Sequence, residues 1–281
     1  MSQKIHRIFG MSSRQWAIIA AAATTAAAAA AAYALRVWEA WRRQRPATVP
    51  SLVLTYLDIP GFAEPIRLVL AVGGVAFEDR RVGYDEVARL RLAGDLPNGQ
   101  VPVLHIDSVP FGQSAALLRW AGRVAGLAPP HLQLRVDMIE ETMTDLRVAL
   151  RPQWYGNALG RSPRTGELIA GAALTEAQRL AVESALNEDV LPVRLAQLEG
   201  LLLQEGNPGP YFCGEVLTTC DLSFYCLAEG LTDGSYCAGV SRAVLGGFPA
   251  LLELAARVGR LPAVRAWNAH ANAKEGARCS P

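Results

Sequence analysis

Three polar residues in the first half of the chain have the types and places that binding chemistry requires: Tyr56, Gln113 and Ser114. Tyr56 ends an apolar run, and a tyrosine hydroxyl, with an ordinary pKa of about 10, stays a hydrogen-bond donor at neutral pH. Gln113 and Ser114 stand where a helix is expected to begin. Ser114 can donate its hydroxyl and backbone N–H to a carboxylate at the positive helix end, or can act as an ordinary N-cap.

The elements that would position these residues follow a simple order. The expected elements are a strand at 51–56, a helix at 66–72, a strand at 77–82, a loop, strands at 103–106 and 109–111, and a helix at 114–124. Gly73-Gly74 closes the first helix, and Asp107-Ser108 is a two-residue hairpin connection. This order predicts an α/β thioredoxin-like domain over residues 51–127.

From residue 128 to residue 281 the strand signals disappear, which predicts an all-α domain. We expect its helices near 132–150, 176–203, 219–230, 249–259 and 262–271. Thr218 and Asp221 form a Thr-x-x-Asp signal before an apolar run. Thr218 can accept from the N–H of Asp221, while Asp221 reaches back to the exposed donors.

These motifs together resemble the glutathione S-transferases, in the sigma-like (prostaglandin D synthase-like) branch. The resemblance is carried by Leu54-Thr55-Tyr56, by the helix start Gly61 to Arg67, by Gln100-Val101-Pro102-Val103-Leu104 and by Gln113-Ser114, and it extends more loosely to residue 271. It implies a thioredoxin-like domain followed by a helical domain, and glutathione as the co-substrate.

The resemblance assigns Tyr56 as the catalytic residue. A free thiol has a pKa of about 8.5, so only a few per cent of glutathione is thiolate at neutral pH. A tyrosine hydroxyl donated to the sulfur favours the thiolate, which then attacks an electrophile.

The resemblance also assigns the residues that hold glutathione. Pro102 matches a cis-proline that lets Val101 pair with the cysteinyl backbone, with Gln100 beside it, while Gln113 and Ser114 take the γ-glutamyl carboxylate. Arg89, or Arg91 nearby, takes the place of the side chains that hold the glycyl end. Glu141 falls where an acidic residue reaches the glutathione of a neighbouring subunit, which implies a homodimer; the alternative is a solvated acidic helix face.

The electrophile pocket is expected to include Phe62, Met143 and Arg147. The turn Pro60-Gly61-Phe62 departs from the Arg-Gly-Arg of sigma-like members, so an aromatic side chain replaces an arginine near the sulfur. We expect a glutathione transferase with a hydrophobic electrophile. The alternatives are a glutathione-dependent isomerase or peroxidase, and a non-catalytic binding or scaffold protein with the same fold.

Composition excludes other classes. The net charge of the 281 residues is +1, which gives no global field for nucleic acid. The five cysteines and four histidines lack zinc-ligand spacing, so we expect free thiols and no metal.

The first 50 residues differ from the rest. Residues 1–15 form a basic tail, 16–35 an alanine-rich segment without charge, and 36–50 a basic linker with prolines. A segment of about 20 apolar residues is long enough to span a membrane, and the arginines after it favour a cytosolic C-terminal part. Because residues 1–38 contain no Asp or Glu, a transit peptide for the mitochondrion or another organelle is one alternative, and a low-complexity tail is another.

Overall fold

A computed structural model describes residues 50–153, 175–232 and 239–278. Contacts divide the chain between Pro50 and Ser51, and all of the described helices and strands belong to the second unit. The segment 16–35, which we predicted as a membrane or targeting segment, lies outside the described residues. Among the helices that are described, none has the length and apolar character needed to cross a membrane.

A four-stranded mixed sheet organises the first part of this unit. The strands are β1 (Leu52–Leu57), β2 (Glu78–Val82), β3 (Val103–Ile106) and β4 (Val109–Phe111), in the spatial order β2-β1-β3-β4. β1 pairs parallel with β2 and antiparallel with β3, which forms the predicted hairpin with β4. Asp107 and Ser108 both have positive φ, at 48° and 71°, as a two-residue hairpin turn of this twist requires.

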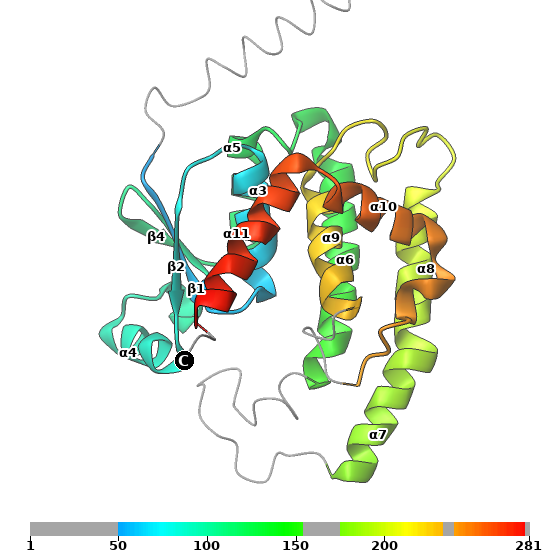
Figure 1. The fold of residues 1–281 in the computed structure, drawn as a ribbon, viewed down its shortest axis with the longest axis horizontal. Coiled ribbons are helices and arrows are strands. Elements are labelled where there is room, and N and C mark those ends of the chain that lie inside the picture. The colour runs from blue at the N-terminus through cyan, green and yellow to red at the C-terminus, as the bar shows by residue number, and fades with distance from the viewer. Residues whose placement is uncertain (1–49, 154–174, 233–238, 279–281) are drawn as a thin grey trace, which may run out of the picture. The chain divides into compact units, whose positions relative to one another are not determined.

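Helices cover both faces of the sheet (Figure 1). On one face, α3 (Glu64–Val72), which follows a short 3-10 turn (Gly61–Ala63), packs against α5 (Ser114–Ala125) and belongs to the main core. On the other, α4 (Tyr84–Ala93) closes a smaller core through Val87 and Leu90. A second 3-10 turn (Pro97–Gly99) leads from α4 toward β3.

Our expectation of a loop between residues 82 and 103 was therefore incomplete, because α4 occupies part of it. Its sequence is largely charged, and only Val87 and Leu90 are buried, so it shows little apolar periodicity. The helix is held by packing on Val82, Leu96 and Val103, which lie elsewhere in the sequence.

The rest of the unit is helical, as expected. Its elements are a 3-10 turn (Pro130–Leu132), α6 (Gln133–Gln153), α7 (Glu176–Ala185), a π-helical turn (Leu186–Val190), α8 (Leu191–Leu202), α9 (Thr219–Thr232), a 3-10 turn (Val244–Gly247), α10 (Pro249–Gly259) and α11 (Pro262–Arg278). α11 returns to the first part and packs on α3, where the indole N–H of Trp267 donates to Glu64 Oε1 at 2.7 Å. This contact ties the end of the helical part to the beginning of α3.

The predicted Thr-x-x-Asp signal anchors the start of α9. The carboxylate of Asp221 accepts from the N–H of Thr218 at 2.8 Å and from the N–H of Phe212 at 2.9 Å. The hydroxyl of Thr218 donates to the same carboxylate at 2.9 Å, rather than accepting from the Asp221 N–H as we expected. Burial raises the pKa of Asp221 to about 6.

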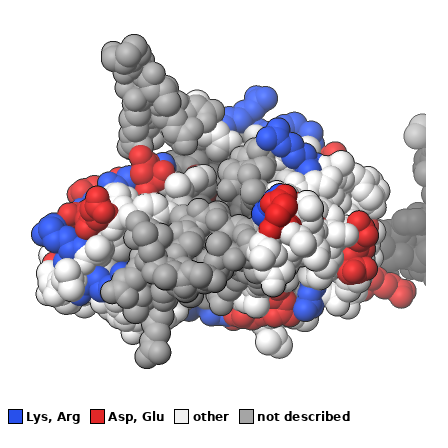
Figure 2. Space-filling view, turned by 90° about the horizontal axis from the view of Figure 1, so that it is seen from below, with Lys and Arg blue, Asp and Glu red and all other residues white. Residues whose placement is uncertain are grey.

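On the face seen in Figure 2, the described basic and acidic side chains are interspersed rather than gathered into a patch of one sign.

Candidate active site

Tyr56 lies near the end of β1 and is only 5% exposed. Its hydroxyl oxygen accepts the backbone N–H of Phe62 at 3.2 Å. Gly61, with φ of 47°, lets the chain pass directly over the ring, since a Cβ at this position would lie 2.6 Å from the Tyr56 hydroxyl. The turn of residues 61–63 therefore covers the tyrosine and fixes the position of its oxygen.

Arg67 of α3 holds this turn, and the sequence patterns gave it no role. Its side chain is fully buried, yet each guanidinium nitrogen has an acceptor. Nε donates to Asp79 at 2.8 Å, and Nη2 donates to the Leu57 carbonyl. Nη1 donates to Glu64 and to the carbonyls of Ile59 and Pro60. The guanidinium also lies 5.7 Å from the centroid of the Tyr56 ring. Arg67 thus ties the end of β1 to the turn that covers Tyr56.

The peptide bond between Val101 and Pro102 is cis, as the resemblance implied. Pro102 is buried, whereas Val101 is half-buried and pairs with no strand of the sheet. Gln100, beside it, is exposed and extended, with φ of −136°. The backbone of Val101 is thus outside the sheet ladder and available to a peptide ligand.

Gln113 and Ser114 stand at the start of α5. Gln113 occupies the N-cap position with φ of 71° and ψ of 99°, and no side chain caps the helix. Ser114 is the first helical residue, so it is not the ordinary N-cap that we considered. The polar groups at this helix start are therefore not spent on capping, which suits a site for an anion.

A cleft of about 220 Å³ lies between these residues and the helical part. Its walls come from the turn and α3 on one side, from α5, and from α6 and α9 on the other; the lining residues are Phe62, Pro65, Gln113, Ser114, Ala115, Leu118, Arg119, Val136, Asp137, Glu140, Glu141, Thr144, Arg147 and Thr219. Tyr56 itself is not among them. It sits behind Phe62, to whose backbone its hydroxyl is bonded.

The predicted pocket residues fall in different places. Phe62 and Arg147 line the cleft, whereas Met143 is wholly buried in the core and does not. Glu140, which we did not single out, also lines it. A signal was present, because positions 136, 140, 143, 147 and 150 follow the spacing of an apolar helix stripe and two of them are charged.

Glu141 is 57% exposed at its side chain and forms an ion pair with Arg119 of the same chain at 2.5 Å. Asp137 joins the same guanidinium at 2.8 Å. Any contact of Glu141 with a neighbouring subunit's ligand would thus compete with Arg119.

Arg89 lies on the surface of α4, 65% exposed, and pairs with Glu86 at 2.6 Å. It does not line the cleft. Arg91 lies closer to the turn before Gln100, since its Nε donates to the Gly99 carbonyl at 2.7 Å.

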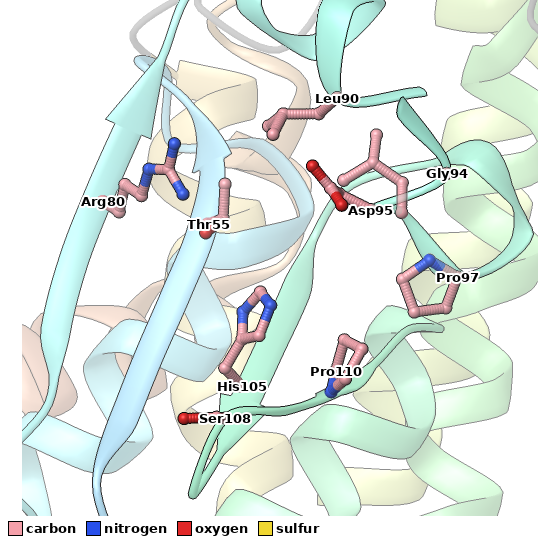
Figure 3. A pocket seen from close by; sticks show the side chains of 10 residues that line it. Thr55, Arg80, Leu90, Gly94, Asp95, Pro97, His105, Ser108 and Pro110 are labelled. Carbon is pink, nitrogen blue, oxygen red and sulfur yellow. The ribbon is translucent and has the colours of Figure 1, made fainter. Parts of the chain in front are cut away.

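A larger cavity, of about 450 Å³, lies under α4 and contains none of the predicted site residues, Arg89 included. In Figure 3, Thr55, Arg80 and His105 project from neighbouring strands, with Asp95 and Pro97 across from them.

Comparisons with known proteins agree with this architecture. Residues 52–123 match the model of the glutathione S-transferase N-terminal domain, and residues 168–271 match a model of the C-terminal domain. Glutathione S-transferase S1 of Drosophila melanogaster is 30% identical over 219 residues, 77% of each chain. Glutathione S-transferase P of Caenorhabditis elegans is 31% identical over 220 residues, covering 77% of this chain and 91% of the relative.

Solved structures give the same picture. The glutathione S-transferase of Ascaris lumbricoides superposes with a TM-score of 0.62 at 29% identity, covering 79% of this chain and 97% of that one. Prostaglandin synthase D of Nilaparvata lugens superposes with a TM-score of 0.63 at 25% identity, covering 78% and 97%. With its thioredoxin-like sheet, its helical second part and both domain matches, the chain belongs to the glutathione S-transferase family.

Proposed function

We propose that this chain conjugates glutathione to an electrophile and that Tyr56 activates the thiol. The observation that supports this role is the hydrogen bond from the Phe62 N–H to the Tyr56 oxygen. A hydroxyl whose oxygen accepts such a bond is polarised toward donating its own proton. When the turn lets the sulfur approach, the Tyr56 hydroxyl donates to the thiolate, and the thiol proton leaves to solvent.

The free energy needed to activate the thiol of glutathione is modest. Lowering the pKa of the thiol by two units takes about 2.7 kcal/mol of preferential stabilisation of the anion. A hydrogen bond to a charged group contributes about 1.5–3 kcal/mol, so one donor in a water-poor site supplies much of it. The thiolate then forms a C–S bond with the electrophilic carbon, and the leaving group departs with the electron pair of the bond that breaks.

The remaining contacts of glutathione follow from the same geometry. The unpaired backbone of Val101 receives the cysteinyl backbone, with Gln100 beside it, and the start of α5, at Gln113 and Ser114, receives the γ-glutamyl carboxylate. For the glycyl carboxylate, Arg91 is nearer to Gln100, whereas Arg89 would first have to leave Glu86. Glu141, if it leaves Arg119, reaches a second subunit, and we retain the homodimer as part of the proposal.

Isomerisation is the second candidate reaction. The chain is 29% identical to hematopoietic prostaglandin D synthase of Gallus gallus over 221 residues, which cover 78% of this chain and 96% of that one. This likeness supports the sigma-like branch, in which the same thiolate would serve an isomerase.

The test is conjugation of 1-chloro-2,4-dinitrobenzene by the full chain, with Tyr56→Phe beside the wild type and glutathione binding measured by calorimetry. We expect kcat to fall at least tenfold in the variant while glutathione still binds. A wild-type protein that neither conjugates nor binds glutathione would favour the non-catalytic scaffold.

A further inference from the structure

Two ionisable side chains on α6 face the cleft, and each has a buried polar atom without a hydrogen-bond partner. Glu140 and Arg147, two helical turns apart, are 7% and 8% exposed, and both line the cleft. Glu140 Oε1 and Arg147 Nη2 are buried and have no hydrogen-bond partner. Neither residue takes part in an ion pair within the described part of the chain. Burying a charge without a partner is strongly unfavourable, so an arrangement of this kind needs an explanation.

Packing alone does not explain the unpaired atoms, because two other inward-facing arginines, Arg67 and Arg135, have an acceptor for each guanidinium nitrogen. Every nitrogen of Arg67 has an acceptor. Arg135, earlier on α6, donates Nε to the Phe212 carbonyl, Nη1 to Gln204 and Nη2 to the Leu201 carbonyl. Arg147 differs from both in having an unpaired nitrogen at a cavity wall.

The neighbouring helix does not supply the missing acceptor. Ser223 of α9 is completely buried, and its hydroxyl faces Glu140, whose pKa it lowers. Thr144, between the two charged residues, donates its hydroxyl to the Glu140 backbone carbonyl. The unsatisfied groups therefore stand together beside the cleft.

A planar guanidinium binds a carboxylate best, through two parallel hydrogen bonds. A carboxylate is therefore the acceptor that best suits the guanidinium of Arg147. Burial raises the pKa of Glu140 to about 7, so Glu140 is about half protonated at neutral pH and mostly protonated below it, and its protonated form is a donor. In that form the wall offers donors and carries a positive charge.

We propose that Arg147, with Glu140 beside it, is a specificity-determining subsite that binds a carboxylate on the electrophilic substrate. The inference rests on the proposed transferase function, in which glutathione is held by the opposite side of the cleft. Within one subunit, the groups assigned to glutathione lie on the cis-proline segment, on α4 and at the start of α5, whereas Arg147 projects from α6. Glu141, also on α6, is assigned to the glutathione of a second subunit. Phe62 lines the same cleft and provides an aromatic surface for the body of the electrophile.

The experiment compares two electrophiles that differ in charge, 4-chloro-3,5-dinitrobenzoate and its methyl ester, with the full chain. In both, the thiolate forms a C–S bond at the carbon that loses chloride. Each kcat/KM is divided by the uncatalysed rate constant, and the acid-to-ester ratio is the readout. We expect a wild-type ratio of at least ten, lowered at least tenfold in Arg147→Met and less in Arg147→Lys.

Two further variants complete the design. Glu140→Gln removes the neighbouring negative charge, so we expect it to raise the acid-to-ester ratio above pH 7. Arg194→Met is the matched control, because it makes the same substitution on α8, at an arginine that pairs with Asp145 at 3.7 Å and does not line the cleft. Its ratio should equal that of the wild type. Should Arg147→Met fail to fold, the acid-to-ester ratios of Arg147→Lys and Glu140→Gln test the proposal instead.

The proposal is overturned if the wild type shows no preference for the acid, or if Arg147→Met leaves the ratio unchanged. An unchanged ratio with a raised KM for glutathione would assign Arg147 to a carboxylate of glutathione instead. If the wild type turns over neither electrophile, the transferase proposal fails separately. Calorimetry with 4-methyl-3,5-dinitrobenzoate and its methyl ester, which have no leaving group, then tests the subsite alone, and equal affinities for the two would overturn it.

Discussion

The two walls of the cleft differ in how completely their buried polar groups are paired. Behind Phe62, the fully buried Arg67 has an acceptor for every nitrogen, and the Tyr56 oxygen accepts a backbone N–H. On the opposite wall, Arg147 Nη2 and Glu140 Oε1 have none. The first wall is completed by the fold itself, which suits a co-substrate that is always the same. The second is the wall at which we propose that a carboxylate of the substrate binds.

The largest effect should come from breaking the paired wall. Arg67→Met leaves Asp79 with Arg81 as its remaining partner and leaves the carbonyls of Leu57 and Ile59 without this donor. Removing one partner of a buried ion pair costs about 3–5 kcal/mol. Denaturant unfolding at neutral pH measures this loss. Arg89→Met is the control, since losing the exposed pair of Arg89 with Glu86 should change the free energy of unfolding far less. Equal losses in the two variants would remove the distinction between the paired wall and the surface.

The unpaired wall should respond to pH instead. Burial raises the pKa of Glu140 from 4.5 to about 7. Arg147, the Ser223 hydroxyl and Arg119 oppose the rise, while Asp221 adds to it. The pKa of Glu140 is higher in the folded than in the unfolded state. The contribution of protonated Glu140 to the free energy of unfolding is therefore fully present below about pH 4.5 and is lost as pH rises to about 7.

Glu140→Gln removes that pH dependence. Relative to the wild type, the variant should gain about 3 kcal/mol between pH 4.5 and 7, from a shift of roughly 2.5 units at 1.36 kcal/mol each. Unfolding curves of both proteins at each pH give the difference. A difference that does not change with pH would mean that Glu140 is not buried as a charge-sensitive group.

A smaller effect should follow from crowding Tyr56. Gly61→Ala places a methyl 2.6 Å from the Tyr56 hydroxyl at a φ of 47°, and such backbone strain costs about 1–3 kcal/mol. Conjugation per folded molecule should fall as well, because the tyrosine must move.

Gly74→Ala separates strain from crowding. Gly74 also has positive φ, 64°, but nothing lies within 4 Å of an added methyl. Its stability should fall while conjugation per folded molecule stays the same. Loss of activity in both variants would show that backbone strain alone, and not contact with Tyr56, is responsible.

Local signals were enough to predict much of the fold. Turn residues predict the hairpin at Asp107-Ser108, and apolar spacing predicts the helices at 249–259 and 114–124. α4 does not, because tertiary packing on Val82, Leu96 and Val103 holds a mostly charged segment in a helix.

The candidate site likewise contains residues that local motifs predict and residues that only tertiary contacts place. Tyr56, the cis-proline and the start of α5 follow from motifs, each of which occupies a short run of sequence. Arg67 was missed because its acceptors include the carbonyls of Leu57 and Ile59, which carry no side-chain signal. Of the adjacent acids, Glu140 faces the core and Glu141 the solvent. The spacing of the apolar stripe carried that signal, but we did not use it.

The pKa of the bound glutathione thiol tests the central claim most directly. Ultraviolet absorbance of the thiolate, titrated with glutathione bound to the wild type and to Tyr56→Phe, gives this value for each protein. We predict that the wild type lowers it by about two units from the free value of about 8.5, and that Tyr56→Phe restores at least half of the shift. Equal thiol pKa values in the two proteins, with glutathione bound to both, would contradict the role of Tyr56.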